Sequence, residues 1–177
     1  MIGVRLAEDL VNLQATGPWE AGAVTEALRR TPIRFDRLDD ATLGDLHAWA
    51  RRLRGVFAAD DVEQRAQRIN ALLAHGVQLV QLATHDGLPP HLHFAGQESS
   101  LVQRVRAMTA GGIAIFAVEA EAGRMGVCAR PGCLRVFADT SKNGRRAYCS
   151  ATCGNSHAVQ RYRERQAYRA SRSAPHS

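Results

Sequence analysis

Four cysteines lie in the last third of the chain and form two close pairs. The first pair is Cys128 and Cys133, and the second is Cys149 and Cys153, with fifteen residues between the pairs. Each pair can hold a metal ion from one turn, while the segment between them folds back to bring the turns together. Two disulfides or four free thiols are the alternatives. The N-terminus lacks the basic region and apolar stretch of a secretion signal, and free thiols seldom cluster as two close pairs. The spacing therefore predicts one zinc ion.

This zinc site is expected to be structural. Four thiolates fill the tetrahedron of ligands and leave no open position for a water molecule. The dipeptide Pro131-Gly132, just before Cys133, fits a tight turn that brings backbone amides towards thiolates. Few apolar residues lie between 124 and 177, and small domains with little core often need a metal staple. We therefore expect this segment to fold only around zinc.

Charge is distributed unevenly along the chain. Residues 124–177 contain eleven Lys or Arg and two acids, a net charge of +9, whereas residues 1–123 contain twelve Arg and fifteen acids, a net charge of −3. A basic segment of this kind favours a polyanion as partner, with nucleic acid ahead of an anionic membrane surface. The alternative is a solvated basic face without a partner. No apolar run approaches the roughly 20 residues that span a bilayer, so we expect no membrane insertion.

The first 123 residues show the periodicity of helices. Apolar residues recur at helical spacing over 6–13, 19–30, 43–53 and 62–82, and a fifth helix is expected over 98–122. Asp39 or Asp40 is suited to cap the third helix, and Gly76 is a point at which the fourth helix can break. A turn is expected over 85–90, followed by a short strand at 91–94. Gly111 and Gly112 weaken the fifth helix by about 1 kcal/mol each relative to alanine.

The cysteine-containing segment predicts a knuckle, a hairpin and a helix. The knuckle is Cys128–Cys133, the hairpin strands are 134–137 and 145–148, and the helix begins at 149–153 with Ser150 as a candidate cap. On that helix, Val159 and Tyr162 are expected to face the hairpin. The fold class is thus mainly α with a small β component: a helical domain over 1–123, a treble-clef-like zinc finger over 124–170, and a disordered tail over 171–177.

The finger resembles a known family in its motifs. They read Cys-x4-Cys, then Val136-Phe137-x-Asp139-Thr140-Ser141-x-Asn143, then Arg146-x-Tyr148-Cys149-Ser150-x2-Cys153-Gly154-Asn155. This pattern resembles the CGNR zinc-finger proteins of bacteria, in which the finger follows a helical domain called ABATE, regarded as a stress-induced transcription regulator. The resemblance is close over about a third of the chain. It implies zinc on the four cysteines, DNA binding by the finger, and a sensing or regulatory N-terminal domain.

The resemblance is looser in the N-terminal part and departs from the family at one position. Leu6-Ala7-x-Asp9-Leu10-Val11-Asn12 is similar to the opening of that domain, and His85-Asp86-Gly87 with His93-Phe94 to its central turn and strand. The family's name motif ends in arginine, whereas this chain has Ser156. An arginine there would supply a cation at the start of the helix, either for a phosphate of DNA or for the structure of the finger.

The expected DNA contacts are basic or polar side chains of the hairpin and helix. These side chains are Arg145, Arg146, His157, Arg161, Arg163 and Arg165. Asn155 is of a type that reads bases, but we favour a structural role because it adjoins a zinc ligand whose sulfur needs donors. His91 and His93 share one face of a strand and can bind a metal, although a structural or solvent-facing role is favoured. Asp9 and Asn12 either brace a pocket or cap local turns.

These features predict a cytoplasmic, zinc-binding transcription regulator that binds double-stranded DNA. The alternative is a zinc-stabilised adaptor for protein or RNA. The chain has no glycine-rich phosphate loop, nucleophile elbow or zinc-hydrolase motif, so we expect no enzyme activity. The N-terminal domain is expected to be a sensor, with a small-molecule effector bound near Trp19 or Trp49, or a dimerisation unit. A homodimer is expected because one finger offers few base contacts.

Overall fold

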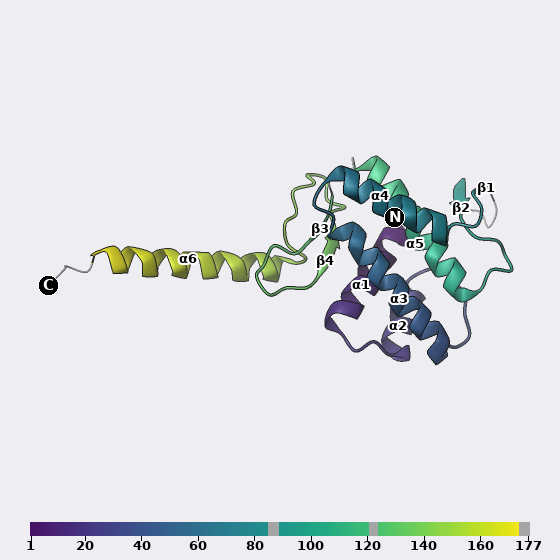
Figure 1. Ribbon diagram of the computed structural model, residues 1–177, viewed down its shortest axis with the longest axis horizontal. Coiled ribbons are helices and arrows are strands. Elements are labelled where there is room, and N and C mark those ends of the chain that lie inside the picture. The colour runs from purple at the N-terminus through teal and green to yellow at the C-terminus, as the bar shows by residue number, and fades with distance from the viewer. Residues whose placement is uncertain (85–88, 121–123, 174–177) are drawn as a thin grey trace.

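The computed structural model describes residues 1–84, 89–120 and 124–173, with side chains described as far as Arg169. Within these residues the chain forms a bundle of five helices, a sixth helix that projects from it, and two small antiparallel sheets (Figure 1). The mainly α class with a small β component is therefore confirmed. The elements are α1 (Ile2–Thr16), α2 (Ala21–Arg29), α3 (Asp40–Phe57), α4 (Val62–Gly76), β1 (Gln81–Ala83), β2 (His91–His93), α5 (Leu101–Glu119), β3 (Met125–Val127), β4 (Val136–Ala138) and α6 (Ala151–Ser173).

Helix α1 lies at the centre of the bundle and packs against α5, α3 and α2. Its buried face carries Val4, Leu6, Leu10 and Val11. Trp49 of α3 is the largest side chain of the core, and its indole nitrogen donates to Thr109 Oγ1 of α5 at 2.9 Å. The core is therefore apolar, and this buried polar group has its hydrogen-bond partner.

Two glycines let α1 and α5 approach closely. A Cβ on Gly3 would lie 2.1 Å from the carbonyl oxygen of Met108, and a Cβ on Gly112 would lie 2.6 Å from the Cα of Gly3. A Cβ on the neighbouring Gly111 would lie 2.4 Å from the ring of Phe94. Gly111 and Gly112 lower the helix propensity of α5, but they let α5 pack closely on α1 and on the segment after β2.

Side-chain caps fix the starts of three helices. Asp39 accepts from the amide of Thr42 at 2.8 Å at the start of α3, and Asp61 accepts from that of Gln64 at 2.7 Å at the start of α4. At α5, Ser100 and Gln103 form a reciprocal capping box. These bonds satisfy amides that have no partner within the helix. The cap at the start of α3 was expected from the sequence.

The helix expected over 62–82 ends at Gly76, the break point that the sequence indicated, and no helix resumes before residue 82. Helix α4 ends at Gly76, and residues 81–83 form β1, which pairs with β2 so that Leu82 lies opposite Leu92. The amide of Gln78 donates to the carbonyl of Phe94 at 3.0 Å, so the chain leaves the helix to pair with the segment after β2. Most of the expected turn at 85–90 lies outside the described residues. The expected strand at 91–94 is present as β2.

Helix α5 is long and apolar enough to cross a membrane by length and composition alone. It has 19 residues and a mean hydropathy of 1.3. In the structure, however, it packs against α1, α4 and α3 and contributes Val105, Ile113 and Phe116 to the core. Core helices share this composition, so the packing of α5 explains its hydropathy.

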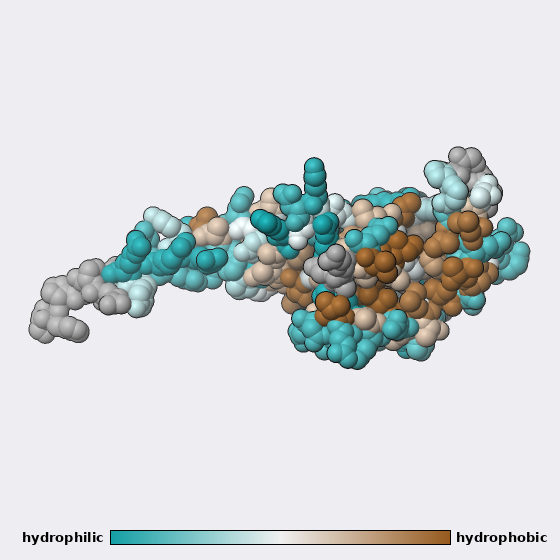
Figure 2. Space-filling model, turned by 90° about the horizontal axis from the view of Figure 1, so that it is seen from above, coloured by the Kyte–Doolittle hydropathy of each residue, from teal (hydrophilic) through white to brown (hydrophobic). Residues whose placement is uncertain are grey.

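The small sheet β3–β4 packs on the helical bundle. Met125, Val136 and Ala138 are buried in the same apolar core as the helices, and β4 lies against α1. Helix α6 instead extends away from the bundle (Figure 1). Apolar side chains gather on the bundle, whereas α6 is mostly hydrophilic (Figure 2). The helix runs to Ser173, so the tail expected to be disordered from 171 is helical as far as 173; residues 174–177 lie outside the described part.

Candidate metal centre and basic helix

The first cysteine pair lies in the loop between β3 and β4. Cys128 directly follows β3, and its amide donates to the carbonyl of Arg135 at 2.8 Å. The loop turns at Gly132, whose φ of 75° is in the left-handed region that favours glycine. The amide of Cys133 then donates to the carbonyl of Arg130 at 3.0 Å. The knuckle is therefore the loop of the hairpin, where the sequence predicted a hairpin following the knuckle.

The second pair lies at the start of α6. Cys149 precedes the helix and Cys153 lies in its first turn. The hydroxyl of Ser150 accepts from the amide of Cys153 at 3.2 Å, as expected for a helix cap. The helix start thus positions both sulfur atoms on the side that faces the knuckle.

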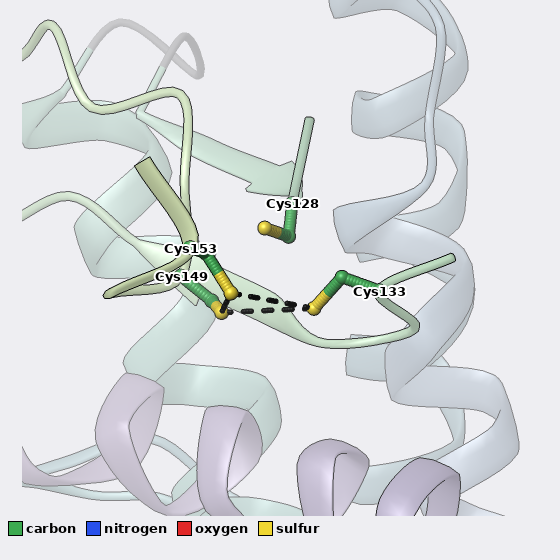
Figure 3. Close-up of side chains that lie close together, drawn as sticks. All are labelled: Cys128, Cys133, Cys149 and Cys153. Carbon is green, nitrogen blue, oxygen red and sulfur yellow. Dashed lines mark hydrogen bonds between the residues drawn. The ribbon is translucent and has the colours of Figure 1, made fainter. Parts of the chain in front are cut away.

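The four sulfur atoms converge on one point (Figure 3), and the relevant ligand atoms all lie within 4.8 Å of one another. The Sγ–Sγ distances are 3.8 Å for Cys133–Cys149, 3.5 Å for Cys149–Cys153 and 3.9 Å for Cys153–Cys133. With zinc–sulfur bonds of about 2.3 Å, a regular tetrahedron has sulfur atoms about 3.8 Å apart. The cluster therefore fits a single structural zinc, which confirms the expected cofactor.

The thiols of the second pair differ in acidity in the absence of metal. Burial and three neighbouring thiols raise the pKa of Cys149 to about 12. Hydrogen bonds from the Ser150 hydroxyl and the Cys149 thiol lower the pKa of Cys153 to about 7. Cys153 therefore deprotonates first, and Cys149 must release a proton when a metal binds. Proton release makes metal affinity rise with pH.

The predicted second hairpin strand at 145–148 is absent. Residues 145–148 form no strand, and β4 pairs with β3 instead. The reason lies at Asp139, which is buried and accepts from the amides of Ser141 at 2.9 Å and Arg146 at 2.8 Å. Burial raises the pKa of Asp139, but these bonds, a further hydrogen bond from the Ser141 side chain and the charge of Arg124 hold it below its usual value. The returning segment is thus held at Arg146 by a side chain and at Ala147 by one backbone bond, from the amide of Ala129 at 2.9 Å.

Two of the expected DNA contacts have partners within the finger. Arg146 Nε donates to the carbonyl of Tyr148 at 2.8 Å, a second guanidinium nitrogen donates to Cys149, and the guanidinium lies 5.4 Å from the Phe137 ring centroid. His157 Nδ1 lies 3.2 Å from the hydroxyl of Tyr148, with the two rings edge to face. The geometry therefore gives Arg146 and His157 roles in bracing the knuckle and the start of α6.

The four other expected contacts are exposed, as is Arg146. Arg145 lies on the surface of the loop before the second cysteine pair, and Arg161, Arg163 and Arg165 are exposed along α6. Arg165 Nε donates to the carbonyl of Arg161 at 3.2 Å, one turn earlier, which leaves the other guanidinium nitrogens at the surface. The one acidic side chain described on α6, Glu164, accepts from Gln160.

One expectation for α6 differs from the structure. Val159 and Tyr162 do not face the hairpin, because α6 projects from the finger and leaves them 50 % and 58 % exposed. Asn155 is exposed on the first turns of α6, and its structural role beside the zinc ligands stays a prediction. Ser156, which stands where the family has arginine, is also exposed.

Sequence reasoning missed the residues that join the finger to the bundle. The side chain of Asn12 pairs with β4 as a strand would: Nδ2 donates to the carbonyl of Val136 at 3.1 Å, and Oδ1 accepts from its amide at 2.7 Å. Glu8, one turn earlier on α1, accepts from the amide of Ala138 at 3.2 Å, and burial raises the pKa of this carboxyl. Two polar residues four apart, next to an apolar helix face, were the available signal.

Neither of two cavities that the structure forms is lined by the tryptophans near which an effector is expected, and binding of an effector stays a prediction. Trp49 is buried in the core, and Trp19 Nε1 donates to the carbonyl of Leu43 at 3.0 Å. One cavity of about 370 Å³ lies between α1 and α2 and is lined by Arg5, Asp9 and Arg30, among others; Asp9 pairs with Arg30 at 3.7 Å. Another, of about 360 Å³, lies in the finger.

Comparison with known proteins agrees with the geometry of the metal centre. A search of the curated proteins gave no match to the chain. A family model, the CGNR zinc finger, matches residues 124–166, a range that contains all four cysteines and the first four turns of α6. The C-terminal part of this chain is therefore similar to the CGNR zinc finger, and its four cysteines come together as a metal site requires.

Proposed function

We propose that this chain is a zinc-finger DNA-binding protein that regulates transcription in bacteria. The observation that carries the proposal is the arrangement of α6. This helix begins at the zinc cluster, projects from the bundle, and exposes Arg161, Arg163 and Arg165 along its length. A fixed helix with exposed arginines suits a phosphate backbone, because the guanidinium group binds phosphate oxygens in pairs.

The dimensions of α6 support a place in the major groove. Its 23 residues span about 35 Å at 1.5 Å per residue, and the groove, about 12 Å wide, admits one helix. Zinc holds the start of α6 against the knuckle, so its direction relative to the bundle is fixed. The mildly acidic bundle would be repelled by DNA, which leaves the finger as the contact surface.

The cavity of the finger supports a second contact. It is lined by Asp139, Thr140, Ser141, Asn143, Arg145 and Arg146. Arg145 is exposed there, and the surrounding hydroxyl and amide groups are typical donors to phosphate oxygens. We expect this hollow to hold a phosphate group beside the one or two turns of duplex that α6 follows.

The exposure of Val159 and Tyr162 favours an alternative function. Apolar and aromatic side chains on a projecting helix also suit a protein partner, and tyrosine stacks on unpaired bases of RNA. The alternative is therefore an adaptor for protein or RNA without sequence-specific DNA binding. For the helical bundle, the proposal is an ABATE-like regulatory role, either as a sensor of a small molecule or as a dimerisation unit, without catalytic activity.

A charge-matched pair of variants of the full, zinc-loaded chain tests the proposal. Replacing Arg161, Arg163 and Arg165 with alanine should weaken binding to duplex DNA at least tenfold, and each lost phosphate contact should reduce the log–log salt slope by about 0.9. The control replaces Arg29, Arg51 and Arg52, which are exposed on α2 and α3, and should retain affinity because it changes only the bundle.

Three outcomes would decide against DNA binding. One is equal affinity of the two triple variants for duplex DNA. Another is tighter binding of the wild-type chain to single-stranded RNA than to duplex DNA at matched salt, which would favour the RNA adaptor. The third is a wild-type affinity that does not change between 50 and 200 mM salt, since a phosphate-binding helix must release counterions.

A further inference from the structure

A pair of polar side chains lies between the exposed arginines of α6. Gln160 and Glu164 are both exposed, and Gln160 Nε2 donates to Glu164 Oε1 at 3.0 Å. Each residue of a helix advances by about 100° around the axis, so residues four apart point about 40° from each other. Gln160 and Glu164 therefore form one stripe along α6, which we call the polar stripe. Because the helix projects from the finger, this stripe is open to a partner (Figure 1).

The arginines flank the polar stripe on both sides. By the same geometry, Arg163 lies about 80° to one side of the middle of the stripe, and Arg161 and Arg165 lie about 80° and about 120° to the other side. All three are exposed. The walls of the major groove are the two phosphate backbones, so a helix in the groove directs flanking arginines at phosphates and the residues between them at base edges. The polar stripe therefore occupies the position that reads sequence.

The negative charge of Glu164 restricts the bases that it can face. No ion pair joins Glu164 to a neighbouring arginine among the residues that the structure describes, and its partner is Gln160. A carboxylate is repelled by phosphate and by the acceptor atoms that guanine and thymine present in the major groove. The amino groups of cytosine and adenine are the donors there. Glu164 therefore selects sequence by exclusion, because a guanine or thymine at its position leaves the carboxylate without a donor.

The hydrogen bond to Glu164 leaves Gln160 able to bind adenine. An amide nitrogen carries two hydrogens, so Nε2 keeps one donor, and Oε1 keeps its lone pairs. This donor and acceptor match N7 and the N6 amino group of adenine, which is a typical partner of glutamine in the major groove. Four residues of helix rise about 6 Å and successive bases about 3.4 Å, so Gln160 and Glu164 reach bases one or two steps apart.

We propose that Gln160 and Glu164 determine the DNA sequence that this chain prefers, with adenine at Gln160 and cytosine at Glu164. The inference rests on the proposed DNA binding and adds its specificity. The flanking arginines supply affinity for any duplex, whereas the polar stripe discriminates among sequences. Glu164 has a second role, since its hydrogen bond orients the amide of Gln160 towards the base.

Selection from a random duplex library by the full, zinc-loaded chain tests this assignment. The wild type should enrich adenine and cytosine one or two positions apart. Gln160→Ala should reduce the preference for adenine and Glu164→Gln that for cytosine, each by roughly fivefold or more. Glu164→Gln should bind other duplexes at least as tightly as the wild type, because it removes a carboxylate from the neighbourhood of phosphates. The control, Gln166→Ala, changes an exposed glutamine of α6 about 140° from the middle of the stripe and should keep both preferences.

A modified base tests the contact to adenine independently of folding. Replacing the selected adenine with 7-deazaadenine, which lacks N7, should weaken binding by the wild type and leave binding by Gln160→Ala unchanged. Selection of no sequence by the wild type, or the same preferences in the wild type and both stripe variants, would overturn the inference. In either case salt-dependent binding to duplex DNA would leave the proposed function intact. A wild-type chain without such binding would overturn both.

Discussion

The helical bundle and the zinc finger reach a fixed structure by different means. The bundle buries a continuous apolar core around α1, with Trp49 and Phe57 fully enclosed. The finger has four converging sulfur atoms in place of a core of its own, and its apolar residues Met125, Val136 and Ala138 belong to the core of the bundle. The finger therefore depends on zinc at one end and on the helices at the other.

Two sets of contacts connect these regions, one between the bundle and the hairpin and one between the hairpin and α6. The hairpin β3–β4 anchors the finger to the bundle, because Asn12 and Glu8 of α1 occupy its outer edge and Arg54 of α3 donates to the carbonyl of Leu134 at 2.7 Å. The zinc cluster in turn joins the hairpin loop to the start of α6. A change in the bundle can thus reach α6 through the hairpin and the metal, and also through residues 139–149, where Arg5 of α1 donates to Thr140 and Tyr148 contacts His157.

The largest expected effect is the loss of zinc. Structural zinc contributes about 10–16 kcal/mol to folding in small fingers at neutral pH. In Cys149→Ser we expect zinc content below half an equivalent, and loss of hydrogen-exchange protection in the knuckle and the first turns of α6. The bundle should remain helical with a lower melting temperature, because Val136 and Ala138 lose the support of the folded finger. The control is Ser156→Ala, on the exposed side of α6.

Full zinc content in Cys149→Ser would contradict the four-thiolate site. Complete unfolding of the bundle in that variant would instead contradict the view that its core is self-sufficient. Metal analysis and hydrogen exchange on the same sample separate these outcomes.

The next largest expected effect concerns the packing of α1 against α5 within the bundle. Gly112→Ala should destabilise it by up to about 3 kcal/mol, because the new Cβ would lie 2.6 Å from the Cα of Gly3 and force α1 away from α5. Gly44→Ala on α3, where a Cβ would meet nothing within 4 Å, should stabilise it by up to about 1 kcal/mol. Urea unfolding followed by circular dichroism gives both values. Zinc content should stay at one equivalent in both variants; a destabilising Gly44→Ala would refute the packing argument.

The sequence predicted the helices and the zinc ligands well, for physical reasons. Apolar periodicity located α1, α2 and α3, and Asp39 was a recognisable cap, because helix geometry and capping are local. The spacing of the two cysteine pairs is itself typical of a zinc site, so the metal centre can be predicted without knowledge of tertiary contacts. The sequence predicts only that the two glycines of α5 weaken the helix. Their role in packing depends on Gly3, more than 100 residues away, and is not visible in the local sequence.

The errors arose where a distant partner decides the local structure. The strand that replaces the end of the expected helix depends on the bond between Gln78 and Phe94, and the absence of a strand at 145–148 depends on the carboxylate of Asp139. Neither partner is visible in local composition. The hydrogen bonds that Arg146 and His157 form with Tyr148 were not foreseen either, whereas DNA binding by Arg146 and His157 stays a prediction.

The smallest expected effect concerns the link between the two regions. Asn12→Ala removes both bonds to Val136 and leaves the amide and carbonyl of a buried strand without their partner, which should cost about 1–2 kcal/mol. Asn12→Asp keeps the acceptor for the Val136 amide and should lose less. Urea unfolding measures the stability, and the rate of zinc release to a chelator measures how firmly the hairpin holds the knuckle; both should change in Asn12→Ala. The control, Asn70→Ala, changes an exposed residue of α4 and should alter neither. If Asn12→Ala released zinc no faster than Asn70→Ala, the hairpin would not transmit the state of the bundle to the metal, and the two regions would act independently.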